Sequence, residues 1–122
     1  MWIFKAKLTP PEVPPRLREL LKDYPGHVER LREVLEKFAE PKPRLQPFDE
    51  AIWALESVLD GFVDEANVEL HEAEASNCAE AIRRAQQKRQ LMLSAQSRGV
   101  GLAGESLQGL WDFFETNRRA SE

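Results

Sequence analysis

Three residues of the kind that bind metal ions lie close together in the sequence. His71, Glu74 and Cys78 are spaced three and four residues apart, so a helix would place their nitrogen, oxygen and sulfur donors on one face. Helix pairs that bind two metal ions repeat the pattern Glu-x-x-His, whereas the residue three positions before His71 is Val68. We therefore expect no metal site, with His71 exposed among acids and Cys78 buried at a helix start.

A glycine pattern raises the question of a nucleotide cofactor. Gly99, Gly101 and Gly104 match the sequence G-x-G-x-x-G, whose glycines let the backbone approach a pyrophosphate. That fingerprint follows a strand and opens a parallel βαβ unit, whereas here it follows a basic helical segment and lies 18 residues from the end of the sequence. We interpret the glycines as a flexible connection between helices and expect no cofactor.

The sequence contains no recognisable catalytic arrangement. Acids are plentiful, but paired carboxylates need a pocket that perturbs their pKa values, and no pattern in the sequence predicts one. The serines lack a histidine and an acid at a recognisable spacing. We expect no catalytic residues, and an enzyme of unidentified type ranks third among the classes of function.

A basic cluster has side chains that suit phosphates and base edges. Arg83, Arg84, Lys88 and Arg89 are interleaved with glutamines. Nucleic-acid-binding domains are usually basic, whereas this chain has a net charge of −4, and residues 48–80 contain ten acids and no base. A nucleic-acid-associated regulatory protein that uses residues 83–89 is therefore the alternative, and not the leading interpretation.

Trp53 is the most informative single residue. In a helix that begins near residue 49, Trp53 lies about 100° from the apolar side and shares its own side with Asp60 and Asp64. Either Phe48 or the N-terminal arm covers this ring, or the ring is an anchor for another protein, because aromatic side chains are common in interface hot spots. Phe113 raises the same question in the last helix.

Composition predicts a single domain over residues 1–122. The chain is 42% apolar and 31% charged, which suits a globular protein with one core. No stretch approaches the roughly 18 uninterrupted apolar residues of a membrane helix. The single cysteine cannot form an internal disulfide, and the first residues lack the order of a secretory signal. We expect a cytoplasmic protein with no membrane contact.

The spacing of apolar residues and prolines predicts an all-α fold, a small bundle of about five helices. Residues 1–14 form an extended arm, because alternating apolar residues run into a proline-rich stretch. Residues 15–39 form two short helices, and 48–97 form a long helix or a helical hairpin. Residues 105–119 form a C-terminal amphipathic helix, capped by Ser106, with Trp111 on its core side.

Two arrangements are open for residues 48–97. A single helix over 49–97 would be about 73 Å long, against a radius of gyration of about 14 Å for a compact chain of this length. Asn77, followed three residues later by Glu80, resembles a capping box, which favours a hairpin of helices at about 49–75 and 78–97. The competing arrangement is a continuous helix that forms an antiparallel coiled coil with a second copy of the chain.

The hairpin also accounts for the distribution of charge. A turn near residues 76 and 77 places the acidic segment beside the basic one, and so predicts three ion pairs. These are Glu69 with Arg84, Glu65 with Lys88, and Asp64 with Arg89.

The leading interpretation is a non-enzymatic protein–protein interaction module that acts through self-association or as an adaptor, inhibitor or chaperone-like partner. The expected partner is another protein, which includes a second copy of the chain in a homodimer, rather than nucleic acid. The candidate interaction residues are Trp53, Asp60, Asp64, Phe113, Arg84 and Lys88.

Overall fold

The computed structural model describes residues 10–39, 46–97, 100–102 and 104–117. All regular secondary structure in these ranges is helical, which confirms the predicted all-α fold class. Most of the predicted arm lies outside the described residues, and residues 10–14 are not helical. The elements in chain order are α1 (Pro15–Leu20), α2 (Pro25–Glu36), η1 (Lys37–Ala39), α3 (Pro47–Ser76), α4 (Ala79–Gln96), η2 (Gly104–Leu107) and α5 (Gln108–Asn117).

Proline opens three of these helices. Each of α1, α2 and α3 has proline in its first turn, where the missing N–H would have no helical acceptor in any case. Helix α3 therefore begins at Pro47, before the expected start at Asp49. Asp49 and Glu50 lie in its first turn, where negative charge is favourable, and the Glu50 carboxylate accepts a hydrogen bond of 3.2 Å from the Gln46 N–H.

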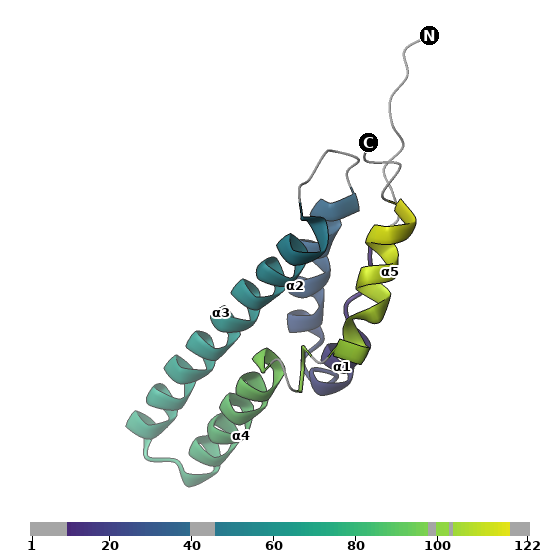
Figure 1. Cartoon of the computed structure of the whole chain (residues 1–122). Helices are drawn as coiled ribbons and strands as arrows, with labels where there is room; N and C mark the ends of the chain where they lie inside the picture. Colours follow the sequence, from purple (N-terminus) through teal and green to yellow (C-terminus); the bar gives the residue numbers. More distant parts are fainter. Residues whose placement is uncertain (1–9, 40–45, 98–99, 103, 118–122) are drawn as a thin grey trace.

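Helices α3 and α4 form the predicted hairpin (Figure 1). Asn77 reverses the chain between them, with φ of 57° and ψ of 23°, in the left-handed region that asparagine tolerates better than most residues. The predicted capping box is wrong, because Asn77 ends α3, and the residue before α4 is Cys78, which makes no side-chain capping hydrogen bond. Cys78 is exposed, and the expectation that it is buried is also wrong.

The core lies where one half of the hairpin meets the other helices. Buried side chains from α1 to α5 belong to one hydrophobic cluster. The fully buried large residues are Leu17, Leu21, Leu31, Leu35, Leu55, Leu59, Phe62 and Met92. Leu17 and Leu21 come from α1 and its C-cap, so this short helix is held by tertiary packing rather than by its own length.

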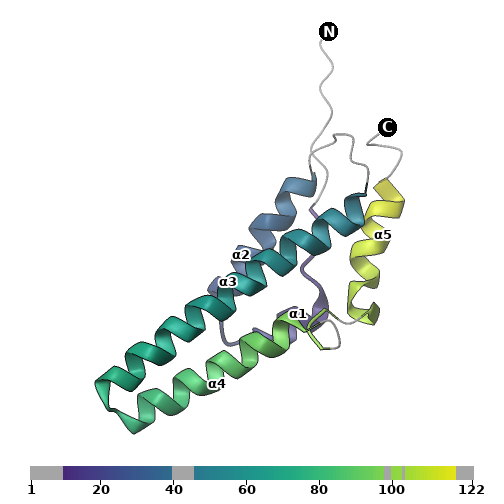
Figure 2. The same cartoon turned by 60° about the vertical axis from the view of Figure 1, so that its left-hand side comes forward.

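The other half of the hairpin extends beyond this core (Figures 1 and 2). No residue from 67 to 91 is buried. Apolar side chains there, such as Leu70 of α3 and Ile82 of α4, are only half-buried. The hairpin is therefore anchored at one end and exposed at its turn.

Helix α5 covers the core from another side, but with a different face from the one expected. Leu110 is only 3% exposed, and the Phe114 ring meets the Phe38 ring edge-on at 5.8 Å. Trp111 was expected in the core and instead is 45% exposed, with its ring edge-on to the Phe48 ring at 5.1 Å. Phe48 thus packs on α5, whereas one expectation was that it covers Trp53, which is 56% exposed.

Two residues that precede α5 have roles that differ from those expected. Ser106 does not act as the predicted cap in this structure, because its Oγ accepts a hydrogen bond of 2.9 Å from the Arg16 N–H at the start of α1. Gly101 donates its N–H to the Ser94 carbonyl at 3.2 Å, and a Cβ at Gly101 would lie 1.9 Å from the Ala95 carbonyl oxygen. Gly101 is therefore required for close packing against α4, whereas the sequence suggested a flexible connection.

Candidate interaction surface

Trp53 lies on the side of α3 that faces away from the core. Its side chain is 56% exposed, while Ile52 and Leu55 on either side of it in the sequence are buried. The buried Phe62 lies nine positions after Trp53, and at 100° per residue the two side chains leave the helix in opposite directions. Trp53 therefore points away from the apolar side of α3, as the sequence predicted.

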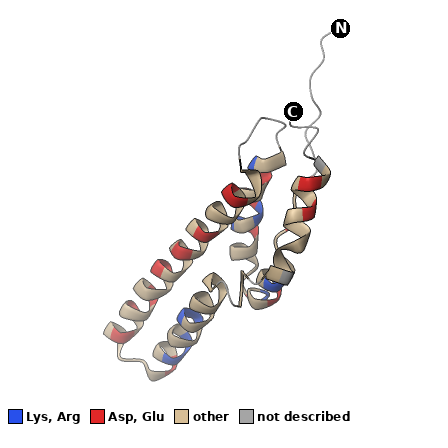
Figure 3. Ribbon diagram, viewed as in Figure 1, with Lys and Arg blue, Asp and Glu red and all other residues tan. Residues whose placement is uncertain are grey.

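An exposed stripe continues from Trp53 along α3. Its members are spaced three or four positions apart, are all exposed, and fall within about 80° of one another on the helix. We call these residues the α3 outer face: Trp53, Ser57, Asp60, Asp64, Val68 and His71. The stripe runs about 27 Å along the helix, and Figure 3 shows acidic residues along α3 and basic residues on α4.

The α3 outer face combines negative charge with unusual apolar exposure. Among the described residues, Trp53 and Val68 are two of the three large hydrophobic side chains that are exposed, at 56% and 57%. Asp60 and Asp64 lie between them. This arrangement brings together three of the predicted candidate residues, Trp53, Asp60 and Asp64, on one helix.

The basic residues of α4 contact acceptors within the same chain. Lys88 forms an ion pair of 2.9 Å with Glu69, and its side chain is only 19% exposed. Arg84 pairs with Glu80 on its own helix at 3.2 Å, and Arg89 donates to the Asn67 side chain. Arg84 and Lys88 therefore serve the hairpin itself and do not join the α3 outer face.

The predicted ion pairs are wrong by about one helical turn. Glu69 was expected beside Arg84 and instead meets Lys88, four residues later. The reason is that both Asn77 and Cys78 lie between the helices, so the centre of the turn is later than expected. Glu65 was expected to meet Lys88 and instead binds Arg30 of α2.

Phe113 is not an isolated exposed ring. It is half-buried, and its ring meets the Phe114 ring edge-on at 5.1 Å. The structure therefore gives Phe113 an aromatic neighbour on its own helix.

A cluster around His27 was not singled out from the sequence. The His27 ring lies 4.2 Å from the Phe62 ring and 5.5 Å from the Tyr24 ring. A cation lies over each of these two rings, with Arg30 at 4.7 Å from the Phe62 centroid and Lys88 at 5.1 Å from the Tyr24 centroid. The only sequence signal was the spacing of Tyr24 and His27, which does not reveal partners from α3 and α4.

Two acids complete the His27 cluster. Arg30 donates two hydrogen bonds to the Glu65 carboxylate, at 2.9 and 2.8 Å, and Lys88 binds Glu69. The hydrogen bonds from Arg30 are the main cause that lowers the pKa of Glu65 below its usual 4.5. The pKa of His27 is lowered from 6.5, first by burial and then by the charges of Lys88 and Arg30, while Glu65 and Glu69 oppose the change.

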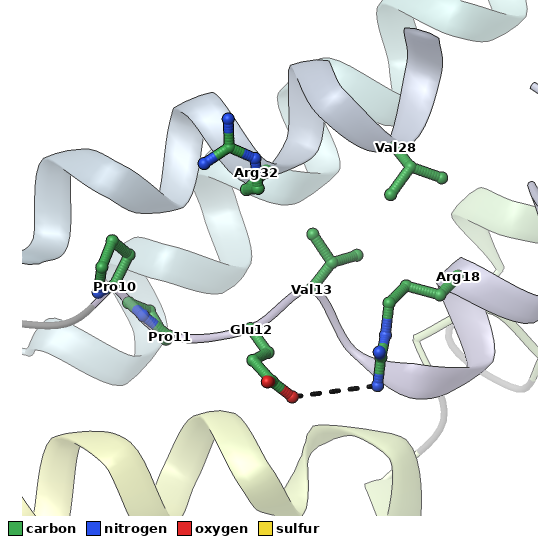
Figure 4. A pocket seen from close by; sticks show the side chains of 7 residues that line it. All are labelled: Pro10, Pro11, Glu12, Val13, Arg18, Val28 and Arg32. Carbon is green, nitrogen blue, oxygen red and sulfur yellow. Dashed lines mark ion pairs between the residues drawn. The ribbon is translucent and has the colours of Figure 1, made fainter. Parts of the chain in front are cut away.

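The described residues form a hollow beside α2, and they bring no set of metal ligands together. One shallow hollow lies between residues 10–13 and helix α2, lined by prolines, valines and a few charged groups (Figure 4). Its one acid, Glu12, lies 3.9 Å from Arg18. Within the described ranges, no three acidic, histidine or cysteine side chains come together as metal ligands, so His71, Glu74 and Cys78 form no such group there.

Comparisons with known proteins give the chain no relative. No family model, no curated protein and no solved structure matches it. In the part of the chain that the structure describes, none of the helices has the length and apolar character needed to cross a membrane. Inferences about function therefore depend on the surfaces described above.

Proposed function

We propose that the protein is a protein-binding module, without catalytic activity, whose contact surface is the α3 outer face with Trp53 as its anchor. The observation that carries this proposal is the 56% exposure of Trp53 on the half of α3 whose opposite side is buried in the core. Tryptophan is among the residues that contribute most binding energy at protein interfaces. A helix held rigidly by the core presents such an anchor at little cost in conformational entropy.

The charge of this face favours a partner with basic side chains. Asp60 and Asp64 lie between Trp53 and Val68 on the α3 outer face. Pairing of this face with the same face of a second copy would bring these carboxylates close to their equivalents, and like charges at an interface are unfavourable. The proposal therefore favours a different protein over a homodimer through this face. A cationic side chain can also stack on the Trp53 ring.

A photo-crosslinking amino acid in place of Ser57 tests the proposal, because that position lies inside the face. We expect crosslinks to a defined protein in cells of the source organism, and loss of about 2 kcal/mol or more of binding energy for that protein in Trp53→Ala. Trp111→Ala is the matched control, since Trp111 is 45% exposed on α5. Equal binding by Trp53→Ala and the wild type would reject Trp53 as the anchor.

Sedimentation at several concentrations tests self-association separately. The proposal predicts that the association state of the purified chain is the same in the wild type and in Trp53→Ala. A dimer that dissociates only in Trp53→Ala would assign the α3 outer face to self-association instead.

A further inference from the structure

His27 stands apart from the α3 outer face, because it lies between α2 and the hairpin. It is in the first turn of α2, and its ring contacts Phe62 of α3. Figures 1 and 2 show α2 lying along the half of α3 that carries the core. His27 is therefore one of the residues that join α2 to the hairpin.

The environment of the imidazole suits its neutral form. The Nε2 atom is buried, and no described residue offers it a hydrogen bond. The aromatic rings of Tyr24 and Phe62 lie near it, with ring centroids 5.5 and 4.2 Å from that of the imidazole. A proton on Nε2 would create a buried donor without an acceptor, which is unfavourable.

The charges that face His27 come from three helices. Arg30 on α2 and Lys88 on α4 oppose a further positive charge, whereas Glu65 and Glu69 on α3 favour it. Each of these acids already binds one of the two cations, Glu65 with Arg30 and Glu69 with Lys88, which reduces their effect on the imidazole. The N-terminus of α2 adds a partial positive charge at the same place.

We propose that His27 is an acid-sensitive contact: uptake of a proton at its imidazole releases α2 from the hairpin, while the neutral imidazole holds α2 in place. The neutral ring packs against Tyr24 and Phe62, whereas an imidazolium would add a positive charge near Arg30 and Lys88 and a buried N–H that has no acceptor among the described residues. Release moves the ring toward water, where the charge is solvated. The transition is local, because α3 and α4 contact each other more extensively than α2 contacts α3.

The direction of the effect follows from linkage. Because the native pKa of His27 lies below 6.5, the closed state binds fewer protons than the open state. The stabilisation of the closed state is complete above the ordinary pKa of histidine. It decreases as the pH falls from about 6.5 toward the lower native pKa. Glu65 stays ionised in this range, because its own pKa is lowered from 4.5.

Nuclear magnetic resonance on the full chain tests the proposal directly. The chain has two histidines, so the wild type gives two imidazole titrations, and His71→Gln assigns the one from His27. We expect a midpoint below about 6.5 for His27. Lys88→Gln should raise this midpoint, and Arg83→Gln, which removes a cation from the same helix away from His27, should leave it unchanged. A wild-type midpoint at or above the ordinary histidine value would overturn the proposal.

Hydrogen exchange tests the release of α2. After correction for the intrinsic pH dependence of exchange, amide protection in α2 should decrease by up to about tenfold per pH unit below pH 6.5, while α3 near Leu59 keeps its protection. His27→Gln should remove this pH dependence, and His71→Gln should retain it. Equal loss of protection in α2 and α3, or the same pH dependence in His27→Gln, would overturn the proposal. If His27→Gln does not fold, the proposal is tested by the His27 midpoints of the wild type and Lys88→Gln and by the exchange of the wild type.

Discussion

Gly101→Ala places a methyl group where the backbone of α4 already lies. The new Cβ would be 1.9 Å from the Ala95 carbonyl oxygen and 2.6 Å from its carbonyl carbon, well inside any van der Waals contact. Because these are backbone atoms near the end of a helix, no side-chain rotation relieves the clash. The segment that carries Gly101 must move away from α4.

The displacement has a calculable effect on stability. It breaks the hydrogen bond from the Gly101 N–H to Ser94, and it moves Leu102, which is only 3% exposed and donates its N–H to Ser97 at 3.0 Å. Overpacking of this kind costs about 1 to 3 kcal/mol, and partial exposure of a leucine adds about 1 kcal/mol. We therefore expect a loss of about 3 kcal/mol in the free energy of unfolding, or roughly 10 °C in melting temperature.

Gly61→Ala is the matched control for Gly101→Ala. Gly61 lies inside α3, and a Cβ there meets nothing within 4 Å. The same substitution should stabilise the protein by about 0.5 to 1 kcal/mol, because alanine favours a helix interior over glycine. Urea unfolding followed by circular dichroism measures both variants. A Gly101→Ala variant as stable as the wild type would refute the packing role of Gly101.

Three further predictions concern the hairpin, the core and one surface ion pair. Asn77→Ala should lower the free energy of unfolding by about 1 kcal/mol, whereas Asn77→Gly should leave it unchanged or raise it, because residue 77 has φ of 57°. Urea unfolding measures both variants, and equal effects of the two would contradict this prediction. Leu59→Ala should cost about 2 to 5 kcal/mol, since Leu59 is fully buried, whereas Val68→Ala should change the unfolding free energy by less than about 0.5 kcal/mol. Glu65→Gln should lower the free energy of unfolding by at most about 1 kcal/mol in thermal melts, because the ion pair of Glu65 with Arg30 is about half exposed. A larger loss would mean that this ion pair stabilises the fold more than its exposure suggests.

Local periodicity in the sequence determines three features: the all-α fold class, the hairpin and the direction of Trp53. Spacings of three and four residues place Leu55 and Leu59 on one side of α3 and Asp60 and Asp64 on another, in any tertiary context. The hairpin also follows, since a single 49-residue helix would have left its apolar side uncovered within one compact chain. These features were predicted correctly.

The details of the turn depended on a dihedral angle that the sequence pattern does not specify. Asparagine is favoured both before a helix and, in the left-handed conformation, after one. Asn77 takes the second role, and this choice moved the centre of the turn and shifted the partner of Glu69 from Arg84 to Lys88. A local ambiguity of one or two residues thus became an error of one helical turn in the ion pairs.

Contacts between distant segments were decided only by the tertiary structure. Phe48 packs on Trp111, which lies 63 positions later in the sequence, while Trp53 and Trp111 are both exposed. His27 acquires its properties from Phe62 and Lys88, which belong to two other helices. Periodicity fixes which side of a helix is apolar, whereas burial, charge and pKa depend on which other helix lies against that side, and only the packed chain determines this.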